Sequence, residues 1–251
     1  MLEGKPRSGG GGTSAIASNR LLSYLSADDL QLLQRHLTPV ALPLRKDLEK
    51  PNRRIEDVYF LDAGIASVIA IQTADKRVEV GLVGCEGMTG TSVVLGAVSS
   101  PHATYIQVAG QGQHIKTENL QRAMDASKSL HGLLLRYVQS FMIQTAHTAI
   151  SNARATIGQH LARWLLMADD RIKNTALPLT HEFLGLMLGV RRAGVTEALH
   201  ELADQGLIEA HRGQIVILNR KGVERAAADS YGLPEAEYKR LIGTGSYNRV
   251  A

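Results

Sequence analysis

The sequence has almost no cysteine and no long apolar run. Its one cysteine, Cys85, excludes an intrachain disulfide framework, a zinc site built from several cysteines and a four-thiolate iron–sulfur cluster held by one chain. A lone cysteine in a turn is more often a packing residue than a redox-sensitive thiol. No apolar stretch approaches the roughly 20 residues that span a bilayer, and the N-terminus lacks the apolar core of a signal peptide. We therefore expect a cytoplasmic protein with no membrane partner.

Motifs for catalysis and metal binding are also missing. The chain contains no glycine-rich phosphate loop, no paired carboxylates at a catalytic spacing and no nucleophile motif. Its nine histidines are scattered, and none forms a pair spaced for a metal ion or a haem. We therefore expect no enzyme, no catalytic residues, no metal site and no certain cofactor.

The composition is that of a globular chain of two ordinary domains. The 251 residues are 44% hydrophobic and 21% charged, enough to bury a sizeable core. The net charge of +4 permits a nucleic-acid partner without requiring one. The position of the positive charges therefore matters more than their number.

The residue pattern changes several times along the chain and predicts an α+β protein. A glycine-rich start lacks an apolar face, short alternating strands separated by turns follow, and helical spacing dominates the second half. The predicted segments are a disordered leader (1–18), a small antiparallel β-barrel domain (19–128), a long helix (129–154), a helical domain with two short strands (155–220) and a C-terminal extension (221–251). Within the extension, two short helices are expected at Lys221–Ala228 and Glu235–Ile242.

The long helix carries one apolar stripe with steps of three and four residues. About 25 residues at 1.5 Å each make a rod of roughly 38 Å. Two interpretations stay open, because the stripe could pack on the chain's own barrel or form a homodimer. We favour the dimer, since the stripe is longer than a small barrel could cover. The candidate dimerisation residues are Leu130, Leu134, Tyr137, Phe141, Thr145 and Thr148.

The segment from Leu179 to Ala210 has the spacing of a helix-turn-helix. Thr180 is positioned to cap a first helix, Gly189 ends it in a tight turn, and a second helix begins near Arg191. Two adjacent arginines at a helix N-terminus oppose the helix dipole, and this is explained if they face DNA. A helical hairpin without a ligand is the weaker alternative.

Two short strands around Arg212 and Gly213 follow, as in the wing of a winged helix. The wing tip is basic and polar, which suits the phosphate backbone. The candidate DNA-binding residues are Thr180, Arg191, Arg192, Gly194, Thr196, Glu197, His211, Arg212 and Gln214.

These features together resemble the Crp/Fnr superfamily of bacterial transcription regulators. The resemblance covers roughly Leu21 to Leu218 and is strongest at Leu179–Ile217 and at the glycine- and glutamate-containing turn Val80–Gly90. It implies a jelly-roll barrel of the cyclic-nucleotide-binding type, a dimerisation helix and a winged helix-turn-helix. Arg192 matches a recognition-helix arginine that contacts guanine in the family. The next position, often glutamate there, is Ala193, so the family's base preference is not transferred.

The resemblance also suggests an effector pocket, in which Glu86 stands at the family's ribose-binding glutamate. Cyclic-AMP binders add an Arg-Ser pair that neutralises the phosphate, but the corresponding segment here, 99–102, contains no arginine. We therefore expect an unknown small-molecule effector, if any, and not cyclic AMP. The pocket candidates are Gly84, Glu86, Gly87, His102 and Thr104.

The favoured function is a homodimeric regulator that binds double-stranded DNA at an inverted repeat, with the helix near 191–203 in the major groove. If the protein activates transcription, the family resemblance implies RNA polymerase as a further partner. The alternative is a barrel-type sensor whose helical C-terminal block docks a protein instead of DNA.

Overall fold

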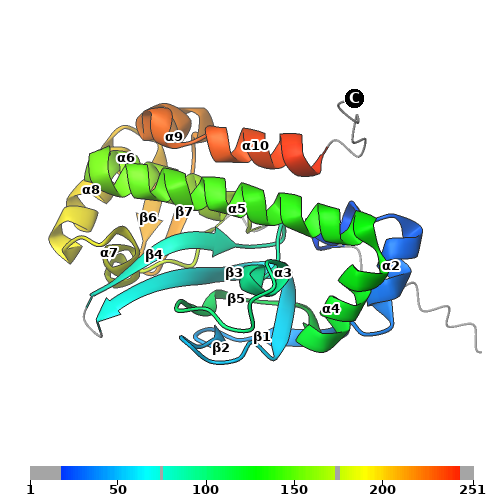
Figure 1. Cartoon of the computed structure of the whole chain (residues 1–251). Helices are drawn as coiled ribbons and strands as arrows, with labels where there is room; N and C mark the ends of the chain where they lie inside the picture. Colours follow the sequence, from blue (N-terminus) through cyan, green and yellow to red (C-terminus); the bar gives the residue numbers. More distant parts are fainter. Residues whose placement is uncertain (1–17, 74–75, 173–175, 244–251) are drawn as a thin grey trace, which may run out of the picture.

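Figure 1 shows the chain in a computed structural model that describes residues 18–73, 76–172 and 176–243. The predicted leader lies outside these residues except for Ser18, and so do the last residues of the predicted C-terminal extension, 244–251. The elements of the N-terminal half are α1 (Arg20–Ser23), α2 (Ala27–Gln34), β1 (Thr38–Leu42), β2 (Asp47–Glu49), β3 (Asp57–Thr73), β4 (Lys76–Val83), α3 (Thr91–Val94), β5 (Ala103–Lys116) and α4 (Thr117–Ala126).

The second half is mostly helical, and the α+β class is confirmed: an antiparallel N-terminal sheet, a long helix and a C-terminal helical region follow one another. The remaining elements are α5 (Lys128–Arg154), α6 (Ile157–Asp169), α7 (His181–Leu188), α8 (Arg192–Asp204), β6 (Ile208–His211), β7 (Gln214–Ile217), α9 (Arg220–Ala227), the 3₁₀ turn η1 (Ala228–Ser230) and α10 (Leu233–Ile242).

Two long antiparallel strands, β3 and β5, form the centre of the N-terminal sheet. They pair from Asp57 opposite Lys116 to Ile69 opposite Ala103, and the order of neighbours is β1-β5-β3-β4, with β2 also on β5. The register shifts between Leu61 and Ala66, and such bulges bend and twist a strand. The bend lets one continuous sheet wrap a core that includes Leu42, Leu61 and Ile106.

Helix α5 runs along the sheet in Figure 1 and begins where the sequence predicts. The hydroxyl of Ser127 accepts a hydrogen bond from the amide of Leu130 (3.2 Å), which caps the helix. Its inner face is buried in a cluster with Phe60 and Met88 of the sheet domain. Helix α6 follows after Ala155 and starts with a reciprocal capping box between Thr156 and Gln159.

The sheet and the C-terminal helices share one hydrophobic core. Ile69 and Leu82 of the sheet pack in the same cluster as Trp164 and Leu165 of α6 and Met187 of α7. Buried apolar contacts of this kind stabilise the arrangement of the two halves. The C-terminal helical region therefore packs directly against the sheet.

The C-terminal extension returns to the N-terminal half. Its two predicted helices are present as α9 and α10, and Figure 1 shows α10 running alongside α5. Ile242 of α10 is buried in the cluster around α5, and the carbonyl of Leu241 accepts a hydrogen bond from Nε of Arg136 (2.9 Å). No helix among the described residues is long and apolar enough to cross a membrane.

Candidate nucleic-acid interface and adjoining cavities

The turn between α7 and α8 has the local geometry that a helix-turn-helix requires. The hydroxyl of Thr180 accepts a hydrogen bond from the amide of Phe183 (3.2 Å) and so caps α7. Gly189 ends α7 with φ at +65°, a left-handed conformation that glycine adopts at little cost. The amide of Val190 then donates to the carbonyl of Gly185 (3.0 Å), which closes the turn before α8.

Helix α8 presents one buried and one exposed face. Val195 and Leu199 are fully buried against α6 and α7, whereas Arg191, Arg192 and Glu197 are exposed, as is His200 further along. No side chain caps the first turn of α8 among the described residues. The exposed N-terminal turn of α8 therefore combines two arginines with backbone amides, a combination that attracts anions.

Two of the candidate DNA-binding residues on α8 contact other helices of the chain. The hydroxyl of Thr196 lies 3.0 Å from Nδ1 of His181 and donates to the carbonyl of Arg192, so it links α8 to α7. Gly194 is half-buried, and a Cβ there would lie 3.0 Å from the side chain of Ile157. Gly194 thus permits close packing of α8 on α6. His181 was not singled out from sequence, because nothing in the pattern shows which residue faces Thr196.

The wing is formed by β6 and β7, with the predicted turn at residues 212–213. They pair from Ile208 opposite Ile217 to His211 opposite Gln214, and Leu177 adds an isolated bridge to Ile215. Three exposed polar residues, His211, Arg212 and Gln214, are at the tip. Nε2 of His211 lies 3.0 Å from a carboxylate oxygen of Glu209, so the surface of the wing also contains one carboxylate beside its tip.

A small cavity of about 90 Å³ lies between the sheet, α3 and α5. Of the five predicted pocket residues, His102 and Thr104 line it. Glu49 lines it as well, and its carboxylate accepts a hydrogen bond from the amide of Gly90 at the start of α3 (2.7 Å). Burial raises the pKa of Glu49, against the opposing effect of the Gly90 and Thr104 hydrogen bonds. No sequence pattern points to Glu49, because it comes from a strand far from the glycine-rich turn.

Three predicted pocket residues lie outside this cavity, which corrects the effector-site interpretation. A Cβ at Gly84 would lie 2.5 Å from the side chain of Arg171, and one at Gly87 would lie 2.2 Å from the hydroxyl of Tyr137. Glu86 pairs with Arg171, with Oε1 and Nε 2.8 Å apart. The physical reason is that the turn after β4 faces the end of α6 and α5, so its glycines admit those side chains instead of a ligand.

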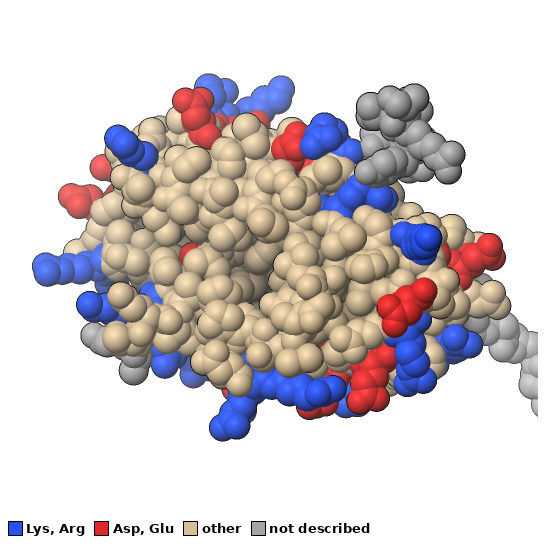
Figure 2. All heavy atoms as spheres, in the orientation of Figure 1, with Lys and Arg blue, Asp and Glu red and all other residues tan. Residues whose placement is uncertain are grey.

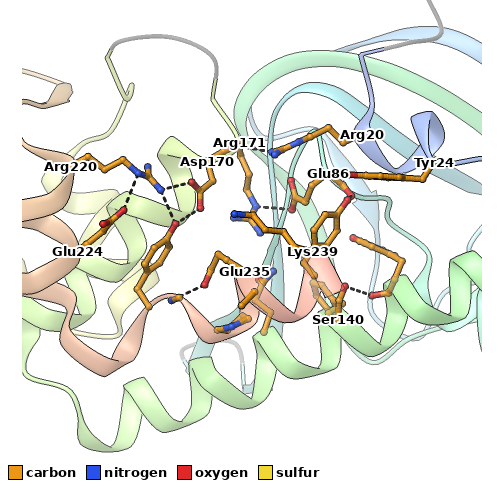
Figure 3. Close-up of a pocket in the computed structure, with 18 residues that line it drawn as sticks. Arg20, Tyr24, Glu86, Ser140, Asp170, Arg171, Arg220, Glu224, Glu235 and Lys239 are labelled. Carbon is orange, nitrogen blue, oxygen red and sulfur yellow. Dashed lines mark hydrogen bonds and ion pairs between the residues drawn. The ribbon is translucent and has the colours of Figure 1, made fainter. Parts of the chain in front are cut away.

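A much larger cavity of about 630 Å³ lies on the other side of this turn (Figure 3). Its walls come from α1, the Glu86 turn, α5, the end of α6, α9 and α10. Arg220 on α9 forms ion pairs with Asp169, Asp170 and Glu224. Burial alone would lower the pKa of Arg171, but the carboxylates of Glu86, Asp170 and Glu235 outweigh it and raise that pKa.

Most of the predicted dimerisation stripe of α5 is buried within the chain. Leu130, Leu134 and Tyr137 are buried in the core with the sheet domain, and Phe141 and Thr145 line the small cavity. Thr148 is buried and accepts a hydrogen bond from Arg163 of α6 (3.1 Å). Most of the stripe therefore packs on the chain's own sheet, which is the alternative left open above. Leu130, Leu134, Tyr137 and Thr148 are buried and not exposed to a second chain, whereas Phe141 and Thr145 are half-buried.

The opposite face of α5 carries exposed apolar residues. Leu135, Met142 and Ile150 are 41%, 57% and 56% exposed. Figure 2 shows an uncharged band of surface along the middle of α5, hollowed below the helix, with charged side chains at the margins. We call the exposed residues that repeat in steps of three and four the α5 seam: Leu135, Gln139, Met142, Ala146, Ala149 and Ala153. This is the spacing of a two-helix interface.

No group of three or more metal-binding side chains is assembled among the described residues. The only cysteine, Cys85, is buried and accepts a hydrogen bond from Arg20 (3.2 Å).

Comparisons with known proteins identify the domain that contains α7 and α8 and the fold of most of the chain. The family model of the Crp-like helix-turn-helix domain matches residues 159–226. No curated protein sequence matches the chain. Among solved structures, FixK2 from Bradyrhizobium japonicum is similar with a TM-score of 0.65 and 18% identity, covering 76% of this chain and 98% of FixK2.

Two further structures show the same likeness. CLP from Xanthomonas campestris, a c-di-GMP responsive global regulator, has a TM-score of 0.61 at 18% identity and covers 76% of this chain and 99% of its own. TTHB099 from Thermus thermophilus, a CRP family transcriptional regulator, has a TM-score of 0.61 at 19% identity and covers 76% and 97%. At these identities the structures establish the fold.

Proposed function

We propose that this chain, a Crp/Fnr-type transcriptional regulator with a Crp-like helix-turn-helix DNA-binding domain, binds an inverted-repeat operator as a homodimer. The observation that carries this proposal is the exposed N-terminal turn of α8 with Arg191 and Arg192. In a helix-turn-helix this turn enters the major groove, where an arginine can form two hydrogen bonds to guanine. The exposed wing residues His211, Arg212 and Gln214 would contact phosphates beside it.

Dimerisation is proposed through the α5 seam. The exposed side chains of Leu135 and Met142 are apolar, and the small residues Ala146 and Ala149 would let two helices approach closely. A two-fold axis through the seam would relate two copies of α8. The operator would then contain two half-sites about one turn of DNA apart, roughly 34–36 Å centre to centre.

Cyclic AMP is not proposed as the effector. The small cavity beside α3 holds about 90 Å³, whereas pockets for small molecules usually measure about 300–1,000 Å³. The carboxylate of Glu49 already accepts the hydrogen bond of the Gly90 amide. It also adds a negative charge to a cavity in which a phosphate would need a cation. This small cavity beside α3, called the barrel cavity below, therefore has neither the volume nor the positive charge that a cyclic nucleotide would require.

The test is Arg192→Ala in a DNA titration. A palindromic site is first selected from random DNA with the wild-type protein, and its affinity is measured by fluorescence anisotropy at fixed salt. Losing a two-bond contact to guanine costs about 1–3 kcal/mol, so the dissociation constant should rise about 5- to 150-fold. Arg122→Ala, which removes an exposed arginine from α4, is the matched control and should bind as wild type does.

Equal affinity of Arg192→Ala and wild type would remove α8 from the protein–DNA interface. Negligible DNA affinity that does not change with salt would favour the alternative in which the helical block docks a protein, because phosphate contacts always make binding salt-dependent.

A further inference from the structure

We propose that the 630 Å³ cavity between α5, α6, α9 and α10 binds a small organic anion with an aromatic or aliphatic body. We further infer that this cavity, and not the barrel cavity beside α3, connects a ligand to the DNA-binding domain. The second statement rests on the proposed function, whereas the first concerns binding alone.

The size of the cavity suits a small molecule. Its volume of about 630 Å³ lies within the usual range for ligand pockets and is several times that of the barrel cavity. Figure 3 shows that its side chains project from both halves of the chain. Tyr24 and Glu86 come from the N-terminal half, Arg220 comes from α9, and Lys239 comes from α10.

The wall contains a buried ion pair that is left incompletely bonded. The side chains of Arg171 and Glu86 are 7% and 10% exposed. Nε of Arg171 lies 2.8 Å from Oε1 of Glu86, but the angle between them does not suit a hydrogen bond. Among the described residues, Oε2 of Glu86 has no hydrogen-bond partner either. One terminal nitrogen of Arg171, Nη1, donates to the carbonyl of Met167 (2.7 Å). Buried polar groups are normally satisfied. In the described part of the chain, Nε of Arg171 lacks an acceptor, which an anion would supply, whereas Oε2 of Glu86 lacks a donor.

The wall carries as many cations as carboxylates, but their contacts divide them unevenly. The lining cations are Arg20, Arg171, Arg220 and Lys239, and the lining carboxylates are Glu86, Asp170, Glu224 and Glu235. At the α9 end, Arg220 is paired with Asp169, Asp170 and Glu224, so carboxylates are in excess there.

The other end of the cavity favours an anion. Here Arg171 and Glu86 form an ion pair whose charges cancel. The other charged residues that line this end are one carboxylate, Glu235, and two cations, Arg20 and Lys239. The carboxylate of Asp170 also acts on Arg171, but its two oxygens are bonded to Arg220 and Tyr231. The remaining groups at this end thus have one positive charge in excess, which a carboxylate or sulfonate group would neutralise. The carboxylates at the α9 end direct such an anion toward Arg20 and Lys239.

Tyrosine rings supply the apolar part of the wall. The hydroxyl of Tyr137 donates to the carbonyl of Met88 (3.0 Å), that of Tyr238 to the carbonyl of Glu86 (2.7 Å) and that of Tyr231 to Asp170 (2.7 Å). Because these hydroxyls are already bonded within the chain, the three residues can offer a ligand mainly their rings. Ring surface beside a cation suits an anion with an aromatic or aliphatic body.

The cavity lies where the two halves meet. Arg171 follows α6 of the DNA-binding region, while Glu86 belongs to the turn that follows the sheet strand β4. A ligand that contacts both would bind one arrangement of the two halves better than another. It would therefore change the population of the DNA-binding arrangement by its difference in affinity for the two.

The probe is 8-anilinonaphthalene-1-sulfonate, an aromatic anion that fluoresces in apolar surroundings, titrated against the full chain. The expected result is one bound probe per chain, with weaker binding of N-phenyl-1-naphthylamine, which has the same rings without the sulfonate. Ala236→Phe, an exposed α10 residue that lines the cavity, should weaken the sulfonate's binding more than about tenfold by filling the site. Lys239→Ala should weaken it about two- to fivefold, as expected for an exposed charge.

Two control variants locate the site. Lys221→Ala removes an exposed lysine from α9 outside the cavity, and Ser92→Leu fills the barrel cavity instead. Both should bind the probe as wild type does, with far-UV circular dichroism confirming that every variant is folded. Unchanged binding by Ala236→Phe, loss of binding in Ser92→Leu, or equal affinity for the uncharged probe would overturn the inference.

The same proteins are then titrated with the selected operator, with and without saturating sulfonate probe. A change in DNA affinity that disappears in Ala236→Phe supports the link between cavity and DNA, and an unchanged affinity overturns that link. If the chain binds the operator while the cavity variants leave probe binding unaltered, only this inference fails. If the cavity binds the probe but wild type has no DNA affinity, the proposed function fails and the site remains.

Discussion

Glu79 is a buried carboxyl at the junction of the sheet and the DNA-binding domain. Ser67 of β3 donates a hydrogen bond to Oε2 (2.5 Å), and the indole nitrogen of Trp164 on α6 donates to Oε1 (2.7 Å). Complete burial raises the pKa of Glu79 to about 7, although these two hydrogen bonds and the charges of Arg163 and Arg171 oppose the shift. One side chain thus connects the two halves and changes its charge near neutral pH.

The pH dependence of stability should reveal this carboxyl. Its folded pKa of about 7 lies above the unfolded value, so its contribution is complete below about pH 4.5 and is lost as the pH rises to 7. The shift corresponds to about 3 kcal/mol of unfolding free energy. In Glu79→Gln, which keeps the shape but cannot titrate, this loss between pH 5 and 7 should be absent from urea unfolding curves.

The exposed Glu118 of α4 provides the matched control, because Glu118→Gln should keep the slope of the wild-type protein. A Glu79→Gln variant whose unfolding free energy falls with pH as steeply as that of wild type would mean that Glu79 is ionised throughout this range.

At the scale of elements, α5 serves two surfaces at once. Its inner face packs on the sheet through Leu130, Leu134 and Tyr137, and Gln144 exchanges hydrogen bonds with the backbone of Leu82 on β4 (2.7 and 3.2 Å). Its outer face is the α5 seam. Because α10 and the sheet cover the other sides of the helix, the seam is the part of α5 that a second copy could reach.

Met142→Lys should weaken dimer formation. Met142 is exposed in the single chain, so the substitution should fold, but in a dimer it would bury a charge near its symmetry-related copy. We expect the dimer dissociation constant to rise at least about tenfold, equivalent to about 1.4 kcal/mol or more, in sedimentation across a concentration series. Leu44→Lys, which changes an exposed apolar residue between β1 and β2, should leave the oligomeric state unchanged.

If the Met142→Lys protein sediments as wild type does at every concentration, the α5 seam is not the contact between copies. Phe141, by contrast, is a poor place for this test, because a Cβ added to Gly81 would lie 2.6 Å from its ring. A charge at Phe141 would damage the fold of the single chain and could not report on the dimer alone.

At the scale of the whole molecule, the shared core predicts that the two halves unfold together. The only tryptophan, Trp164, is buried in the cluster that joins α6 to the sheet. Its fluorescence therefore reports on the junction, while far-UV circular dichroism reports on all helices and strands. In urea the two transitions should coincide, as they do for a cooperative unit.

A tryptophan transition at clearly lower urea than the loss of secondary structure would contradict this expectation. It would mean that the DNA-binding domain separates from the sheet before either unfolds, and the junction would then be a weak contact rather than a shared core.

Much of the architecture follows from local pattern. The spacing of Leu130 to Thr148, the cap at Thr180 and the glycine turn at Gly189 predict α5, α7 and α8, because helix periodicity and capping depend on neighbours in sequence. The wing is predicted for the same reason, by two short strands around a glycine turn. The arginines of α8 are recognised from their position at the start of that helix.

What each surface faces was decided only by the tertiary structure. The apolar stripe of α5 predicts a buried face but does not say whether the chain's own sheet or a second copy covers it, and the sheet does. The glycines of the Gly84–Gly87 turn predict that another group lies close to its backbone, but they do not predict which group. In the structure, the side chains of Arg171 and Tyr137 take that place. The large cavity brings together α1, the Glu86 turn, α5, the end of α6, α9 and α10, and no sequence spacing records that meeting. Local propensity acts between neighbours in the chain. Partners that lie up to 152 positions apart, as Glu86 and Tyr238 do, are brought together by the packing of the whole chain.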